Sequence, residues 1–171
     1  MAEAFIAREL GRIGVEGMVR SAGVSADPGS PPLDDVVKVM HEFGIDVSEH
    51  QSRLLTEELV RDSDLVVGLT REHLREAIVL DPGAFDRTFT LKELVRRSQL
   101  AGPRPADAAV GPWLASLVAH RQIVELLGAS PDDDVDDPVG RPRAIVRETA
   151  AELADLSTQG VSLIWPSALR R

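Results

Sequence analysis

The sequence predicts a three-layer α/β protein in which helices cover both faces of a parallel β-sheet. Segments typical of buried strands alternate along the chain with segments typical of amphipathic helices, which favours this class. The run Leu65-Val66-Val67-Gly68-Leu69 is continuously apolar, as expected of a parallel strand that is buried on both faces. Thr70 follows a predicted strand and Thr90 lies near the end of another, at positions where a side-chain oxygen can cap the next helix.

The N-terminal part of the chain predicts a helix, a short strand and a loop. Ile6, Leu10 and Ile13 lie at helical spacing and predict a helix over 1–13. Residues 18–21 can form a short strand after it. Residues 27–32 (Asp-Pro-Gly-Ser-Pro-Pro) have the composition of a loop.

Two further helices are predicted before the apolar strand. Gly44 is suited to the C-terminal end of an amphipathic helix whose apolar residues are Leu33, Val36, Val37 and Met40. Thr56 can cap a short helix that begins with Glu57 and Glu58, whose negative charges favour a helix N-terminus.

Residues 71–79 predict a helix capped by Thr70, and residues 88–91 predict a second strand. Thr90 and Glu93 have the spacing of a capping box for the helix that follows.

The C-terminal part predicts a linker and two helices. Residues 101–111 are rich in Pro, Ala and Gly and indicate a linker, and apolar residues at helical spacing predict a helix over 112–127. Pro142 suits the first turn of a last helix, whose apolar face consists of Ile145, Val146, Thr149, Leu153 and Leu156.

Composition restricts the class of protein. The 171 residues predict a single domain over 1–171 with a substantial core. The net charge of −9, without a basic cluster, argues against nucleic acid or an anionic membrane as a partner. No apolar run reaches the ~18 residues that cross a bilayer, so we expect a cytoplasmic protein. The sequence contains no cysteine, which excludes a cysteine nucleophile within these residues.

Several short motifs follow one another in a recognisable order. Met1-Ala2-Glu3-Ala4-Phe5 is typical of the inside of a helix, and it is followed by residues 20–23 (Arg-Ser-Ala-Gly), 43–53 (Phe-Gly-Ile-Asp-Val-Ser-Glu-His-Gln-Ser-Arg), 64–74 and 134–138 (Asp-Val-Asp-Asp-Pro). Each motif is weak alone, but several in one order are difficult to produce by chance. By these motifs the chain resembles the low-molecular-weight protein tyrosine phosphatase family over most of its length, with 97–131 the part least like it.

The resemblance implies a flavodoxin-like fold in which the first strand and the Cys-x5-Arg phosphate loop of the family are missing from these residues. In the family that strand lies between the second and third strands, so its absence leaves two strand edges unpaired. Each buried, unpaired N–H or C=O costs about 1–3 kcal/mol, against a usual total stability of about 5–15 kcal/mol. We therefore expect either an incomplete record of a longer protein, with its start assigned to an internal Met, or a poorly stable remnant.

The resemblance assigns one catalytic role within the chain. In the family a thiolate attacks phosphorus, backbone amides and an arginine hold the phosphate oxygens, and an aspartic acid protonates the leaving oxygen. That acid corresponds to Asp137, directly before Pro138, whereas composition alone predicts only an exposed acidic loop over 132–137. An EF-hand starting at Asp132 is excluded because Asp137 and Arg143 occupy its Gly and Glu positions, so we expect no metal and no cofactor.

Ser21 and His50 resemble family residues that hydrogen-bond to the back of the phosphate loop and hold its shape. The alternative is a serine at a strand end and an ordinary structural histidine.

The resemblance predicts hydrolysis of phosphotyrosine or other aryl phosphate monoesters through a phosphocysteine in the complete gene product. Its substrates would be phosphoproteins or small phosphate esters. Residues 25–32 contain no aromatic residue, and Pro138 is followed directly by Val139-Gly140, which counts against a preference for phosphotyrosine. These 171 residues alone are expected to be inactive. The alternative function is a non-catalytic pseudophosphatase that binds or regulates a protein partner.

Overall fold

The computed structural model describes residues 1–166, and its backbone contacts divide the chain into two compact units. Unit 1 comprises 1–54 and 136–158, and unit 2 comprises 55–135 and, of the described residues, 159–166. Each unit is described by itself. The prediction of a single domain stays a prediction.

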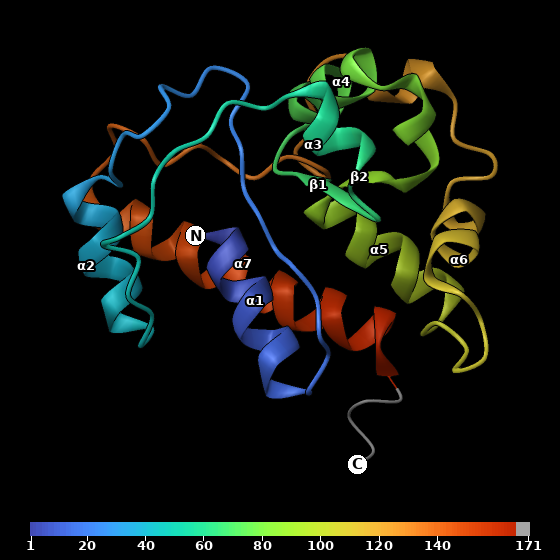
Figure 1. Ribbon diagram of the computed structural model, residues 1–171, viewed down its shortest axis with the longest axis horizontal. Coiled ribbons are helices and arrows are strands. Elements are labelled where there is room, and N and C mark those ends of the chain that lie inside the picture. Colours follow the sequence, from blue (N-terminus) through green and yellow to red (C-terminus); the bar gives the residue numbers. More distant parts are fainter. Residues whose placement is uncertain (167–171) are drawn as a thin grey trace. The chain divides into compact units, whose positions relative to one another are not determined.

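Unit 1 is built from helices and long loops (Figure 1). Its helices are α1 (Ala2–Arg12), α2 (Asp34–Glu42) and the larger part of α7 (Arg143–Ile164). These confirm the helices predicted over 1–13, before Gly44 and after Pro142. Phe5 is fully buried and packs edge-to-face on Phe43, with ring centroids 5.4 Å apart. Gly44 has a φ of +72°, the left-handed conformation that ends a helix.

The strand predicted over 18–21 is wrong. A strand requires a hydrogen-bonded partner, and the parallel bridge in this part of unit 1 instead joins Gly23 to Leu54. The Gly23 N–H donates to the Arg53 carbonyl oxygen at 2.9 Å. This bridge holds the loop after residue 23 beside the loop around residue 53.

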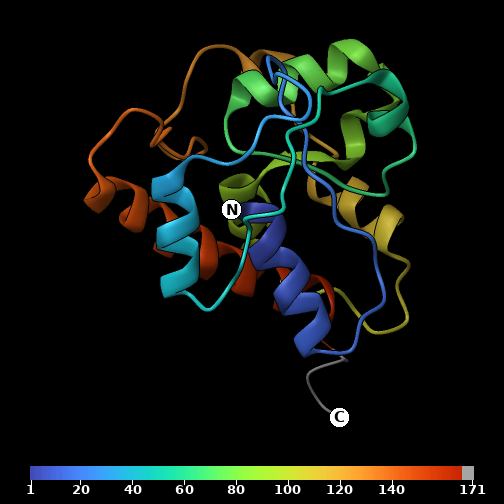
Figure 2. The same ribbon diagram turned by 60° about the vertical axis from the view of Figure 1, so that its left-hand side comes forward.

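Unit 2 contains a parallel sheet with helices on both sides. Strand β1 pairs with β2, with Val66 opposite Thr88, which confirms the predicted α/β class. Helices α4 and α5 lie on opposite sides of these strands in both views (Figures 1 and 2). The elements of unit 2 are α3 (Glu57–Arg61), β1 (Val66–Gly68), α4 (Arg71–Leu80), the 3₁₀ helix η1 (Pro82–Arg87), β2 (Thr88–Thr90), α5 (Leu91–Ala101), α6 (Val110–Leu117) and the 3₁₀ helix η2 (Ile123–Leu126).

Three predicted threonine caps are confirmed in unit 2. Thr56, Thr70 and Thr90 accept hydrogen bonds through Oγ1 from the third residue along, the N–H groups of Leu59, His73 and Glu93. The other half of the predicted capping box at Thr90 is wrong. The Glu93 carboxylate instead binds Arg97 and Arg121 inside unit 2.

The single helix predicted over 112–127 is also wrong. Helix α6 ends at Leu117, and the chain turns before η2 begins. The turn places Arg121 in the core, where its Nη1 donates to the Thr88 carbonyl oxygen at 2.8 Å. Its guanidinium also lies over the Phe85 ring, 4.4 Å from the centroid. These contacts, which replace exposure on a helix surface, account for the break.

The core of unit 2 joins β2, α5 and α6, with Phe89, Leu94 and Leu114 almost fully buried. Gly68 at the end of β1 is required by packing, because a Cβ there would lie 2.7 Å from Leu74 Cδ1. α4 therefore packs closely against the strand that precedes it. Within residues 1–166, no helix combines the length and the apolar character that crossing a membrane demands.

Candidate active site

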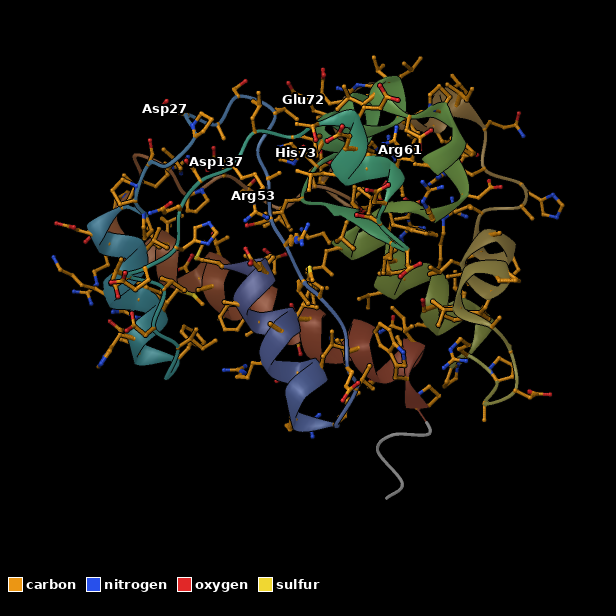
Figure 3. The ribbon with its side chains drawn as sticks, in the orientation of Figure 1. Asp27, Arg53, Arg61, Glu72, His73 and Asp137 are labelled. Carbon is orange, nitrogen blue, oxygen red and sulfur yellow. The ribbon has the colours of Figure 1, made fainter. Side chains whose placement is uncertain are left out.

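Asp137 lies on an exposed loop of unit 1, directly before Pro138 (Figure 3). Its Oδ1 accepts a hydrogen bond from the Val139 N–H at 3.0 Å. Such a bond closes a tight turn around an aspartate. The carboxyl group is therefore presented to solvent on a turn that it forms itself.

The residues just before Asp137 are held firmly in unit 2. We call residues 130–135 the anchor segment. The Asp134 carboxylate accepts the Arg71 N–H at 2.7 Å and the Ser130 N–H at 2.8 Å. Lys92 Nζ donates to the Asp134 carbonyl oxygen at 2.7 Å, and the Val135 N–H donates to the Leu69 carbonyl oxygen at 2.8 Å. The anchor segment is thereby fixed to the carboxyl end of β1 and to the first turn of α4.

Asp133 joins two arginines of unit 2. Its Oδ2 accepts bonds from Arg71 Nε at 2.9 Å and Nη2 at 2.7 Å, and its Oδ1 accepts one from Arg96 Nη2 at 2.6 Å. Burial alone raises the pKa of the Asp133 carboxyl group, but the hydrogen bonds from Arg96 and Arg71 outweigh it, so the pKa lies below its ordinary value. Asp133 is therefore a structural anion.

Ser21 and His50 meet at one carboxylate of unit 1. Ser21 Oγ donates a short hydrogen bond to Glu3 Oε2. His50 Nδ1 lies 3.7 Å from the same oxygen, which makes an ion pair when the imidazole is protonated. Glu3 belongs to α1, and nothing in its sequence context separates it from an ordinary first-turn acid. The structure thus brings the two predicted support residues together through a residue that sequence analysis missed.

The loop over 27–32 is tied to the segment around residue 52. Ser52 Oγ donates a short bond to the Asp27 carbonyl oxygen, and the Ser30 N–H donates to Ser52 Oγ at 3.1 Å. Asp27 and Arg53, labelled with Asp137 in Figure 3, are exposed on these two segments. Their exposure leaves a carboxylate and a guanidinium available on the loops of unit 1.

Unit 2 also contains a polar pocket of about 340 Å³ beside Asp133, lined in part by Arg71, Arg96 and Arg97. Each of these arginines is paired with a carboxylate of the protein: Asp133 binds the first two and Glu93 binds the third. Glu125 and Asp132 also line the pocket, so its three arginines face four carboxylates of the protein. Among residues 1–166, no group of three His, Cys, Asp or Glu side chains is placed to hold a metal ion.

The sequence profile of the family described as low molecular weight phosphotyrosine protein phosphatase matches residues 1–107. The chain is 39% identical over 99 residues to the protein-arginine-phosphatase of Bacillus subtilis, a match that covers 57% of this chain and 65% of that protein. It is 33% identical over 145 residues to a probable low molecular weight protein-tyrosine-phosphatase, EpsP, of Ralstonia nicotianae, covering 85% of this chain and 88% of that protein.

Comparison with solved structures supports the same family. The crystal structure of a low molecular weight protein tyrosine phosphatase from T. tengcongensis matches with a TM-score of 0.69 and 27% identity, covering 94% of this chain and 87% of that one. The flavodoxin-like α/β class predicted from the sequence motifs is thereby confirmed. The chain belongs to the low molecular weight phosphotyrosine protein phosphatase family.

Proposed function

We propose that this chain is the acid-bearing part of a phosphatase that cleaves phosphorylated amino-acid side chains through a phosphocysteine. The observation that carries the proposal is the state of Asp137, an exposed carboxyl group that directly precedes Pro138 and follows a tightly held segment. Pro138 restricts the backbone that presents the carboxyl group. An exposed carboxyl group on a restricted loop can exchange protons with both a leaving group and water.

The proposed reaction has two steps. A cysteine thiolate attacks phosphorus, and the bond from phosphorus to the leaving atom breaks. The Asp137 carboxylic acid donates its proton to that atom, which is the oxygen of a phosphate ester or the guanidine nitrogen of phosphoarginine. Water then attacks the phosphocysteine, Asp137 accepts a proton from the water, and phosphate and the thiolate are released. The thiolate and the arginine that holds the phosphate would come from outside these 171 residues, because the chain contains no cysteine.

In this proposal Ser21 and His50 support the phosphate loop and take no part in proton transfer. Both can donate a hydrogen bond, and both already lie at one position in unit 1, around Glu3. The reaction needs no metal and no cofactor. A cytoplasmic location stays a prediction.

Two substrates fit the proposed chemistry, phosphotyrosine and phosphoarginine. Phosphotyrosine is the substrate class named for the family and for the EpsP relative. The aromatic-free loops of unit 1 favour phosphoarginine, the substrate class in the name of the Bacillus subtilis relative. A guanidinium needs carboxylates rather than an aromatic wall, and Asp27 and Asp136 are exposed on these loops. Turnover of the two phosphoamino acids by one preparation decides between them.

A non-catalytic pseudophosphatase is the second candidate function, and the absence of cysteine from the 171 residues favours it. In that case the protein would bind a partner or regulate an active relative. No proton transfer by Asp137 would then be needed.

The intact mass of the protein purified from its native cells separates the two functions. A mass above 18.5 kDa by one strand and one loop, with an alkylatable cysteine, is the result expected for a phosphatase. A mass that matches 18.5 kDa, together with no turnover of either phosphoamino acid, would favour the pseudophosphatase.

A further inference from the structure

The anchor segment makes many hydrogen bonds for its length. Within six residues, 130–135, it uses the carboxylates of Asp133 and Asp134, the Asp134 carbonyl oxygen and the N–H groups of Ser130 and Val135. The donors outside the segment belong to α4 and α5, which are separated along the sequence by η1 and β2. The Val135 N–H donates to the Leu69 carbonyl oxygen, and the Ser130 N–H donates to Asp134 within the segment itself. The segment therefore has one position relative to the sheet of unit 2.

The Asp134 carboxylate binds at the N-terminus of α4, a position that favours negative charge. Its Oδ1 accepts the N–H of Arg71, the first residue of α4, where the unpaired N–H groups of a helix attract negative charge. The adjoining backbone bond, from Val135 to Leu69, lies just beyond the carboxyl end of β1. In parallel α/β sheets, ligands bind beyond this end of the strands.

Asp137 has no comparable support of its own. Within residues 1–166, its carboxyl group accepts a hydrogen bond from the Val139 N–H, inside its own turn. One residue, Asp136, separates it from Val135, so the two Cα atoms are at most about 7 Å apart. The position of the Asp137 carboxyl group is therefore constrained by the chain on either side of it, by the anchor segment before it and by Pro138 after it.

We propose that Asp134, reinforced by Asp133 and Lys92, is a positioning residue for the general acid Asp137. The inference rests on the proposed function, because it assigns Asp134 a part in proton transfer by Asp137. Proton transfer to a leaving group requires the acid within hydrogen-bond reach of that atom. A displacement of about 1 Å by a remote substitution can lower the rate about 100-fold. Asp134 thus acts through the backbone that it holds.

Kinetics of Asp134→Asn test the proposal in the protein that carries the Cys-x5-Arg loop ahead of these residues. Asparagine keeps one acceptor oxygen and turns an NH₂ group toward an N–H donor, so one of the two bonds is lost. We expect kcat for phenyl phosphate to fall about 10- to 100-fold while KM changes by less than about threefold. The loss should be smaller for 4-nitrophenyl phosphate, whose better leaving group needs less help from an acid.

Three further variants serve as controls for the kinetics of Asp134→Asn. Asp132→Asn, at an exposed aspartate of the same segment, should leave kcat unchanged. Lys92→Met removes the bond to the Asp134 carbonyl oxygen and leaves both aspartates of the anchor segment unchanged. It should lower kcat in the same leaving-group-dependent way, and it provides the test if Asp134→Asn does not fold. Asp137→Asn tests the acid itself.

An unchanged kcat for both Asp134→Asn and Lys92→Met, in folded protein with Asp137→Asn impaired, would overturn the positioning role alone. If Asp137→Asn also left kcat unchanged, the proposed function would fail as well. A uniform loss across both leaving groups would also count against the proposal, because a general structural defect does not depend on the leaving group.

Discussion

Two pairs of adjacent aspartates within 132–137, the held pair Asp133-Asp134 and the exposed pair Asp136-Asp137, have the same composition and opposite surroundings. Asp133 and Asp134 are bound by arginines and backbone N–H groups of unit 2, and Asp133 is only 5% exposed. Asp136 and Asp137 are exposed, and Asp137 is bonded only within its own turn among the contacts described. Whether a carboxylate stabilises the structure or remains free for chemistry depends on its bonding partners. The density of acidic residues in the sequence does not predict it.

The largest effect on stability is expected at Glu93, the most enclosed carboxylate that binds arginine in unit 2. Its side chain is 4% exposed, and it pairs with Arg121, whose side chain is 0% exposed. Glu93→Ala would leave that guanidinium buried without its counterion, so we expect a loss of about 3–5 kcal/mol in the free energy of unfolding. Urea denaturation measures it, with the exposed Glu76→Ala as control. Equal losses for both would contradict the described pairing.

Asp133→Asn should cost less, about 1–3 kcal/mol in the free energy of unfolding. The substitution removes the charge that binds Arg71 and Arg96, but both arginines keep partial access to water. Asp132→Asn changes the neighbouring, exposed aspartate in the same way and should have almost no effect. If the two variants unfold at the same urea concentration, the contacts of Asp133 with Arg71 and Arg96 do not stabilise the fold.

The contribution of Asp133 should depend on pH. Because its pKa is lower in the folded protein than the ordinary value of 3.8, the unfolded chain binds more protons as the pH falls. The stabilisation is fully present above the ordinary pKa and is lost as the pH falls through the folded pKa. The difference in unfolding free energy between the parent and Asp133→Asn, measured across acidic pH, should therefore shrink below the ordinary pKa. If this difference in unfolding free energy grew on acidification, the pKa of Asp133 would be raised in the folded protein rather than lowered.

The smallest effect on stability is expected at the exposed pair, Asp136-Asp137. Asp137→Asn should change the free energy of unfolding by less than about 0.5 kcal/mol, as surface substitutions away from special contacts do. Asparagine can still accept the Val139 N–H. Thermal unfolding followed by circular dichroism is sufficient to measure it. A loss as large as that of Asp133→Asn would make Asp137 part of the structural set.

Local signals in the sequence predicted the elements whose causes are local. The threonine caps of α3, α4 and α5 and the continuous apolar run of β1 are each decided by a few neighbouring residues, and they were found. The break after α6 was missed because Arg121 is drawn into the core by Thr88 and Glu93, about 30 residues earlier in the chain.

The site shows the same division. The assignment of Asp137 rests on its position before Pro138 and stays a prediction. The anchoring of Asp133 and Asp134 was missed because Arg71, Lys92 and Arg96 are distant in sequence. The one available signal was the first Asp of the Asp-Val-Asp-Asp-Pro motif, whose partner the sequence does not reveal. Glu3 was missed for the same reason, since its contacts with Ser21 and His50 form only on folding.

The most direct test of the account is the dependence of kcat on the leaving group for Asp137→Asn in the protein that carries the phosphate loop. Phenol, with a pKa of about 10, needs protonation as it leaves, and 4-nitrophenol needs it less. The account predicts that Asp137→Asn lowers kcat for phenyl phosphate by about 10²- to 10⁴-fold and lowers it much less for 4-nitrophenyl phosphate. Equal rates for parent and variant with phenyl phosphate would contradict the assignment of Asp137 as the general acid.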